Sequence, residues 1–231
     1  MLYVEYGSQQ IYFDLEFRDR KTIAIEVNPD ATVVVKAPIG SNIDEVKAVV
    51  ERRSRWIVKS QLYFEQFLPQ TPPREYVIGE THLYLGRSYR LKFVEQEEEA
   101  VKIIGGHLVV YGKEQSSEYI KAALGGWYYS RAMRKFSEAY KQVYPLFDKY
   151  AITHPVIKLM RMKNRWGSCT VTDTIRLNPE LIKVSMKCIE YVLIHELCHL
   201  IEPNHSKRFY AVLSDIMPDW QRWKLKLEKS L

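Results

Sequence analysis

HELCHLIEPNH, residues 195–205, is the stretch that decides the fold of this chain, and it holds three of its six histidines. In an α-helix, His195 and His199 lie one turn apart and about 40° apart around the axis, so both imidazoles can reach one ion. Glu196 lies on the neighbouring flank, where its carboxylate contacts a water at the metal rather than the metal itself and can act as a general base. The stretch therefore predicts a helix that supplies two metal ligands and a base.

A third ligand is predicted from the way this helix must end. Pro203 disfavours helical geometry at Glu202 and cannot continue the hydrogen-bond ladder, so the chain turns. Asn204 tolerates the left-handed conformation that such a turn can require, and His205 can then return to the metal. Three protein ligands leave zinc with an open fourth position, which is typical of a catalytic site. We therefore predict that the three histidines bind one Zn²⁺ ion per chain and that Glu196 is the catalytic residue.

The residues before the motif favour metal binding over a chance match. The apolar residues Ile189, Val192, Leu193 and Ile194 lead directly into it, which indicates a buried helix. A buried histidine pair beside a buried glutamate costs several kcal/mol unless something compensates these polar groups. A bound metal ion would provide this compensation.

Length and composition are those of an ordinary soluble globular protein, with 231 residues of which 46% are hydrophobic and 27% charged. No run approaches the roughly 18 apolar residues of a membrane span, and the N-terminus lacks a signal-peptide pattern. The three cysteines, Cys169, Cys188 and Cys198, are an odd number without a CxxC pair, which argues against a disulfide framework. We therefore expect a cytoplasmic protein.

The first part of the sequence reads as strands followed by a helix. We predict a β-meander over residues 11–36 and a helix that starts with Ser41 as its N-cap and runs towards Phe67. We interpret the cations on this helix, Arg52, Arg53, Arg55 and Lys59, as a solvated face. Three prolines within residues 69–73 indicate that residues 68–74 form a linker. We expect an N-terminal domain over 1–74 and a domain of hairpins and helices over 75–231, with one integrated domain as the alternative.

The second part alternates short strands with longer helices. Strands are predicted at 76–78, 82–85, 89–94, 101–104 and 107–111, with a tight turn at Gly105-Gly106. A helix over 116–144 carries an aromatic stripe that we expect to pack behind the metal helix. Strands at 156–161 and 170–177 flank the segment 163–169. Helices are then predicted at 186–201, 205–216 and 220–229.

Several separated motifs together resemble a known family. They are RWGSC at 165–169, LNP at 177–179, HELCH at 195–199 and NHS at 204–206. In this order they resemble the YgjP-like metallopeptidases, predicted zinc proteases related to SprT-like and other zincin families. The resemblance implies an α+β fold with a zincin-like core, in which the HExxH helix packs on an antiparallel or mixed sheet. It also implies that His195, His199 and His205 are zinc ligands and that Glu196 is the catalytic glutamate.

The metzincins share the spacing of this motif but differ at its centre. Their pattern, H-E-x-x-H-x-x-G-x-x-H, also puts the third histidine ten residues after the first. Glu202 stands here at the glycine position and is followed by Pro203. Met217 could match the methionine turn of that group, but we interpret it as a core residue. We therefore take the spacing as shared zinc geometry.

The function predicted from these observations is hydrolysis of peptide bonds in a peptide or unfolded-protein substrate. The metal polarises the carbonyl while Glu196 activates the water and later protonates the leaving amine. The candidates for contacts with the oxyanion or the substrate are Arg165, Asn204 and Tyr210. The strands at 156–161 and 170–177 could offer an edge to which an extended substrate adds.

Two alternatives belong to other functional classes. A thiol hydrolase based on Cys169 is disfavoured, because the sequence around this cysteine lacks the flanking pattern of that class. The net charge of +6, the cations at 161–165 and the basic tail at 222–226 suggest a nucleic-acid-associated protease of the SprT-like kind, or a non-catalytic metal-containing binding module.

Overall fold

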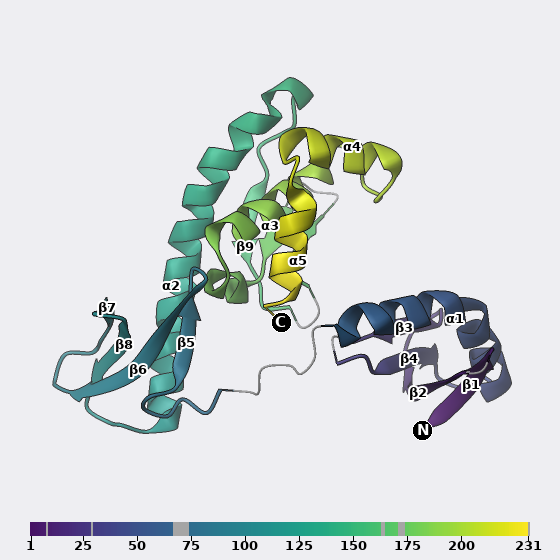
Figure 1. Cartoon of the computed structure of the whole chain (residues 1–231), viewed down its shortest axis with the longest axis horizontal. Coiled ribbons are helices and arrows are strands. Elements are labelled where there is room, and N and C mark those ends of the chain that lie inside the picture. Colours follow the sequence, from purple (N-terminus) through teal and green to yellow (C-terminus); the bar gives the residue numbers. More distant parts are fainter. Residues whose placement is uncertain (8, 29, 67–73, 163–164, 171–173, 231) are drawn as a thin grey trace. The chain divides into compact units, whose positions relative to one another are not determined.

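The structure is a computed structural model of the chain, and it describes every residue except 8, 29, 67–73, 163–164, 171–173 and 231. The chain is α+β, as predicted (Figure 1). Its contacts divide it into two compact units, residues 1–72 and 73–230, which are described one at a time. All of the linker predicted at 68–74 except Arg74 lies outside the described residues. The status of the two units as separate domains stays a prediction.

The N-terminal unit contains a four-stranded sheet. Its strands are β1 (Leu2–Tyr6), β2 (Gln9–Arg18), β3 (Ala24–Val27) and β4 (Val33–Pro38). Their order in space is β1-β2-β4-β3, and β2 runs parallel to β4, so the predicted meander is wrong. The reason lies in burial: Val33, Val35 and Ala37 of β4 are fully or almost fully buried. The most apolar of these strands therefore takes an inner position, and β3, which carries Glu26, lies at the edge.

One long helix, α1 (Ile43–Glu65), covers this sheet. It buries Val46, Val50 and Ile57 in the core of the unit. The helix starts one residue later than predicted, because Asn42 rather than Ser41 caps it: the side-chain oxygen of Asn42 accepts a hydrogen bond of 2.9 Å from the amide of Asp44.

The C-terminal unit begins with a second four-stranded sheet, in the order β5-β6-β8-β7. Its strands are β5 (Thr81–Tyr84), β6 (Arg87–Glu95), β7 (Ala100–Ile104) and β8 (His107–Gly112). Gly105 and Gly106 have φ values of 53° and 78°, as the predicted tight turn requires. The strand predicted at 76–78 does not form. The amides of Glu75 and Tyr76 donate to the carboxylate of Glu80 instead of to a neighbouring strand.

Helix α2 (Ser117–Val143) forms the long side of the C-terminal unit. The hydroxyl of Ser116 caps it by accepting from the amide of Tyr119. Most of its apolar stripe, including Leu124, Tyr128 and Phe136, is buried or partly buried, and the helix packs against the one that carries the histidine motif. This confirms the stripe as core. Met133, which has the same spacing, is exposed. A 3₁₀-helix, η1 (Tyr144–Tyr150), follows.

A small mixed sheet lies under the histidine helix. It consists of β9 (Val156–Leu159), β10 (Gly167–Cys169) and β11 (Thr174–Leu177), in the order β10-β11-β9. We predicted two strands here, and the structure adds β10, which is antiparallel to β11 and lies within the segment that we treated as a connection. The strand β9 is parallel to β11.

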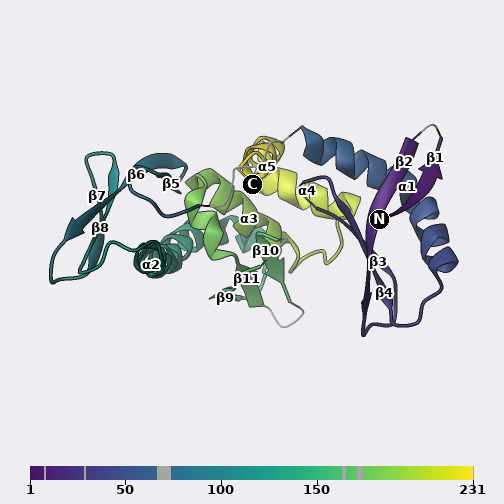
Figure 2. The ribbon, with the colours of Figure 1, turned by 90° about the horizontal axis from the view of Figure 1, so that it is seen from below.

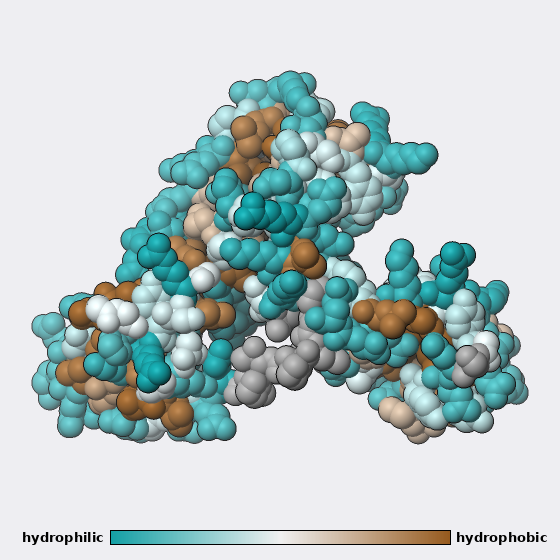
Figure 3. Space-filling model, in the orientation of Figure 1, coloured by the Kyte–Doolittle hydropathy of each residue, from teal (hydrophilic) through white to brown (hydrophobic). Residues whose placement is uncertain are grey.

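The remaining elements are η2 (Pro179–Lys183), α3 (Met186–Cys198), α4 (Lys207–Ile216) and α5 (Trp220–Glu228). Helix α3 packs on β10 and is also in contact with α2, α4 and α5 (Figure 2). An HExxH helix against a mixed sheet is the core that the resemblance implied. Most of the surface in Figure 3 is hydrophilic, with separate hydrophobic areas on both units. Among the described residues, no helix combines the length and the apolar character needed to cross a membrane.

Candidate metal centre

Helix α3 carries the first two histidines and is buried along most of its length. It starts after Ser185, whose carbonyl accepts from the amides of Cys188 and Ile189. It ends at Cys198, three residues before the predicted end, and His199 is its C-cap. Hydrogen-bonded turns continue from there, since the amide of Glu202 donates to Cys198 at 2.9 Å.

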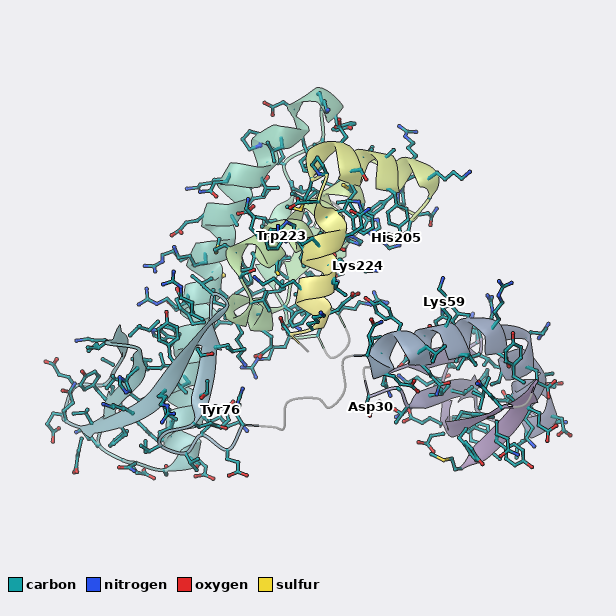
Figure 4. The ribbon with its side chains drawn as sticks, viewed as in Figure 1. Asp30, Lys59, Tyr76, His205, Trp223 and Lys224 are labelled. Carbon is teal, nitrogen blue, oxygen red and sulfur yellow. The ribbon has the colours of Figure 1, made fainter. Side chains whose placement is uncertain are left out.

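The turn after α3 brings the third histidine back to the helix without a left-handed residue. Asn204 is not among the described residues with positive φ, so the turn does not use the left-handed conformation that Asn204 tolerates. Its carbonyl accepts a hydrogen bond of 2.7 Å from the amide of Ser206, whose hydroxyl then caps α4. His205 thus stands just ahead of α4 (Figure 4).

The three histidines of the motif form one compact cluster. Nε2 of His205 lies 3.0 Å from Nε2 of His195. The ring centroids of His195 and His199 are 5.1 Å apart, and that of His205 lies 4.9 Å and 4.7 Å from them. One nitrogen atom from each ring lies within 4.8 Å of the other two. The spacing is that of ligands around a single ion.

Phe209 of α4 forms a common support for the three imidazoles. Its side chain is fully buried, and its ring centroid lies 5.0, 4.7 and 4.6 Å from those of His195, His199 and His205. Packing against one rigid aromatic ring restricts the rotamers of all three histidines. Phe209 therefore helps to hold the three imidazoles in one cluster.

The donor groups fit a zinc ion. Burial, followed by the charges of His199, His205 and Lys224, lowers the pKa of His195 to about 3. Burial also lowers the pKa of His205. Both imidazoles are therefore neutral near pH 7, as metal ligands must be. Nδ1 of His199 lies 3.2 Å from the carbonyl of Glu202, which leaves Nε2 as its free ligand atom.

One buried atom of the cluster has no partner. Nδ1 of His195 is buried and, within the described part of the chain, has no hydrogen-bond partner. An unpaired buried ring nitrogen is unfavourable by itself. A metal ion would bind His195 through Nε2, the nitrogen that faces His205, so the unpaired Nδ1 does not bear on whether the cluster fits a metal.

Glu196 lies next to the histidines on the buried side of α3, with only 5% of its surface exposed. Burial raises the pKa of Glu196 to about 7, although the charge of Arg165 and a hydrogen bond from the backbone amide of Cys169 act in the opposite direction. The strand β10 therefore lies directly on this carboxylate. A carboxyl group that titrates near pH 7 can both accept and return a proton.

A cavity of about 820 Å³ opens onto the cluster. Glu196, the three histidines and Arg165 line it, together with β10. Asn204 and Tyr210, the other two residues that we selected from the sequence, do not line it. Tyr210 instead stacks on His205, with ring centroids 6.2 Å apart.

Helix α5 supplies residues to the cavity that we did not predict. Lys224, Leu227 and Glu228 line it. Burial raises the pKa of Glu228 to about 7, and its carboxylate lies 3.8 Å from the ammonium group of Lys224. We interpreted residues 222–226 only as a basic tail. The alternation of charged and apolar residues along α5 indicates that one face of this helix is buried. The sequence pattern does not show which element that face packs against.

Two histidines one turn apart with a glutamate between them, on a helix beside an open cavity, form the HExxH pattern that is typical of metal-dependent peptidases. The chain belongs to the YgjP-like family, because the family model for the YgjP-like metallopeptidase domain matches residues 21–230. A comparison with curated proteins found no match.

Two solved structures of metallopeptidase zymogens share weak similarity with the chain. Abylysin from Pyrococcus abyssi is 18% identical, with a TM-score of 0.36 over 43% of this chain and 94% of its own. Jannalysin from Methanocaldococcus jannaschii is 20% identical, with a TM-score of 0.33 over 42% and 92%. Neither similarity is high enough to support a statement about the site.

Proposed function

We propose that the chain is a zinc-dependent peptidase that uses His195, His199 and His205 as ligands and Glu196 as its general base. The observation that carries the proposal is the cluster of three imidazoles beside the buried carboxylate of Glu196, which lies on the helix that carries the first two histidines. Zinc, when bound, supplies Lewis acidity, which lowers the pKa of water and polarises a carbonyl group.

Glu196 performs the proton transfers in this proposal. Its carboxylate accepts a proton from the attacking water and then donates it to the amine of the cleaved bond. The raised pKa of about 7 suits both steps. The amide of Cys169 and the charge of Arg165 hold the carboxylate in its position and keep part of it ionised near neutral pH.

The substrate is a peptide in extended conformation that adds to β10. This strand lines the cavity and stands at one end of its sheet, where it pairs with β11 among the described strands. The amide of Cys169 in this strand donates to Glu196, and in the proposal an extended substrate segment pairs with the remaining backbone groups on that side of β10. We predicted such an edge from 156–161 and 170–177, and β10 is the better candidate because it contacts Glu196.

Two cations are suited to bind negative charge in the substrate. Arg165 lines the cavity and acts on Glu196, and Lys224 lines it from α5. The charge of Lys224 acts on both His195 and His205, so it is near the reacting carbonyl. We propose that Lys224 stabilises the oxyanion that forms as the bond is attacked.

Parallel measurements of metal content and peptidase activity test this function. Zinc-loaded wild type is expected to cleave a labelled unfolded protein, while Glu196→Gln binds the same amount of zinc and cleaves about 10³-fold more slowly. Glu190→Gln is the matched control, since Glu190 lies on the same helix and pairs with Lys187. Equal cleavage by Glu196→Gln excludes Glu196 as the base. Absence of zinc from the wild type at low micromolar metal excludes the whole site.

A further inference from the structure

One face of α1 in the N-terminal unit concentrates positive charge. Arg52, Arg55, Trp56 and Lys59 lie within about 100° of arc around the helix, opposite the side chains that it buries. All four are exposed. In Figure 4, Lys59 projects from α1 away from the strands of its unit. We name these four residues the basic face of α1.

The charge of this face is not neutralised by the unit around it. Residues 1–72 carry nine Lys and Arg against ten Asp and Glu, so the unit as a whole is nearly neutral. Between Glu51 and Glu65, however, there are four cations and no acidic residue. Among the described residues, the ion pairs include none from these cations. The positive charge is thus segregated and open to a partner.

Other cations of the same unit do have partners. Arg18 pairs with Glu16 at 2.9 Å, and Lys36 pairs with Glu26 at 2.6 Å. Both pairs lie on the strands. The strands of this unit therefore neutralise their cations, while α1 does not.

The spacing of the cations is unfavourable for the helix by itself. Arg52 and Arg55 stand at i and i+3, and Arg55 and Lys59 at i and i+4, where like charges repel and weaken a helix. Glu51 stands four residues before Arg55, but they form no ion pair in the described structure. A bound polyanion would turn this repulsion into attraction.

An exposed tryptophan on the basic face of α1 indicates the kind of polyanion that it binds. Trp56 is 47% exposed, between Arg52 one turn before it and Lys59 one turn after it. The acidic side chains of a peptide would pair with the cations but have no ring that stacks on the indole. Unpaired bases stack on exposed aromatic side chains while neighbouring cations contact the phosphates. We propose that the basic face of α1 binds single-stranded nucleic acid. This function goes beyond peptide hydrolysis and does not depend on the metal site.

The experiment measures binding of a fluorescein-labelled oligothymidylate of about 20 nucleotides to the full chain by fluorescence anisotropy. With three phosphates neutralised, the logarithm of the association constant is expected to fall with a slope of about −2 against the logarithm of salt concentration. The triple variant Arg52→Gln, Arg55→Gln, Lys59→Gln is expected to weaken binding at least about tenfold and to flatten this slope.

A matched triple variant separates the face from the overall charge. Arg18→Gln, Lys113→Gln and Lys187→Gln together remove the same charge from exposed positions that form ion pairs. This control is expected to keep the wild-type affinity within about twofold. The proposal fails if the control weakens binding as much as the triple variant of the face. It also fails if the wild type does not bind the oligonucleotide at about 50 mM salt.

Trp56 provides the test for base stacking. Trp56→Ala is expected to weaken binding about tenfold, and Trp56→Phe to restore most of it, because a phenyl ring still stacks on a base. Thermal unfolding checks that each variant is folded. Equal affinity for a duplex of the same sequence, or displacement of the oligonucleotide by poly-glutamate at the same charge concentration, overturns the assignment to single strands.

Discussion

Gly167 lies against Glu196 so closely that no other residue fits at this position of β10. A Cβ atom added to Gly167 would lie 2.6 Å from Oε1 of Glu196 and 2.8 Å from its Cγ. Contacts of this length do not occur, so the strand or the carboxylate would have to move. Position 167 in the RWGSC motif therefore holds a glycine because β10 approaches the proposed base closely there.

The first prediction follows from this contact. Gly167→Ala is expected to lower kcat at least about tenfold, because a displacement of about 1 Å at a catalytic group is enough to slow the reaction strongly. Bound zinc should stay at the wild-type amount, since the histidines are not in the contact. Gly126→Ala in α2 is the control: nothing lies within 4 Å of its added Cβ. Unchanged activity of Gly167→Ala would mean that the exact position of Glu196 is not critical.

The second prediction concerns Lys224 and has two readouts that move in opposite directions. Lys224→Met removes a positive charge near the histidines, so zinc affinity should rise roughly fivefold. The same variant should lower kcat about 10²-fold with little change in KM, because the oxyanion loses its partner. Lys224→Arg should recover much of the activity. A loss of both zinc and activity would instead indicate a structural role for Lys224.

How far the sequence predicted this site depends on the range of the interactions. The pairing of His195 with His199 is local to one helix, so their spacing was sufficient. His205 was predicted from its spacing and from Pro203, which ends the helix and turns the chain back. Lys224 could not be predicted, because its position depends on the packing of α5 against α3. The strand β10 is too short to show a periodic pattern, although its RWGSC motif was noticed.

For the fold, too, features set by local interactions were predicted and features set by long-range contacts were not. The helices α1 and α2 were predicted with nearly correct bounds, because apolar periodicity and capping residues act locally. The order of strands in the N-terminal unit was not predicted correctly. The parallel pairing of β2 with β4 depends on contacts between residues that are distant in the sequence. The metal, the ligand roles and the function of Glu196 stay predictions.

The third prediction is a pH dependence of stability at Glu228. Burial raises its pKa to about 7, against about 4.3 in an unfolded chain. Between these values the folded state binds more protons than the unfolded state, so the free energy of unfolding falls as the pH rises through this window. Glu228→Gln removes the effect. At pH 8 the variant should be more stable than the wild type by about 1 to 3 kcal/mol, and at pH 4 the two should be nearly equal.

Urea unfolding of the metal-free proteins at both pH values measures this difference. Glu97→Gln is the control, because Glu97 is 88% exposed and should give no pH-dependent difference from the wild type. A stability difference of Glu228→Gln that is the same at both pH values would contradict the assignment, since a change in packing does not titrate.

The fourth prediction is that residues 74–230 fold and cleave peptides without the N-terminal unit. Each unit has its own hydrophobic core, and the larger core includes the helix of the histidines. All proposed ligands, Glu196 and the residues of the cavity lie after residue 164. The truncated chain should therefore unfold cooperatively, bind one equivalent of zinc and keep kcat within about threefold of the full chain.

The truncated chain should also lose the binding of oligothymidylate, which depends on α1. An unfolded truncated chain would show that the units form one cooperative domain, and a folded chain that still bound the oligonucleotide would move the nucleic-acid site to the larger unit.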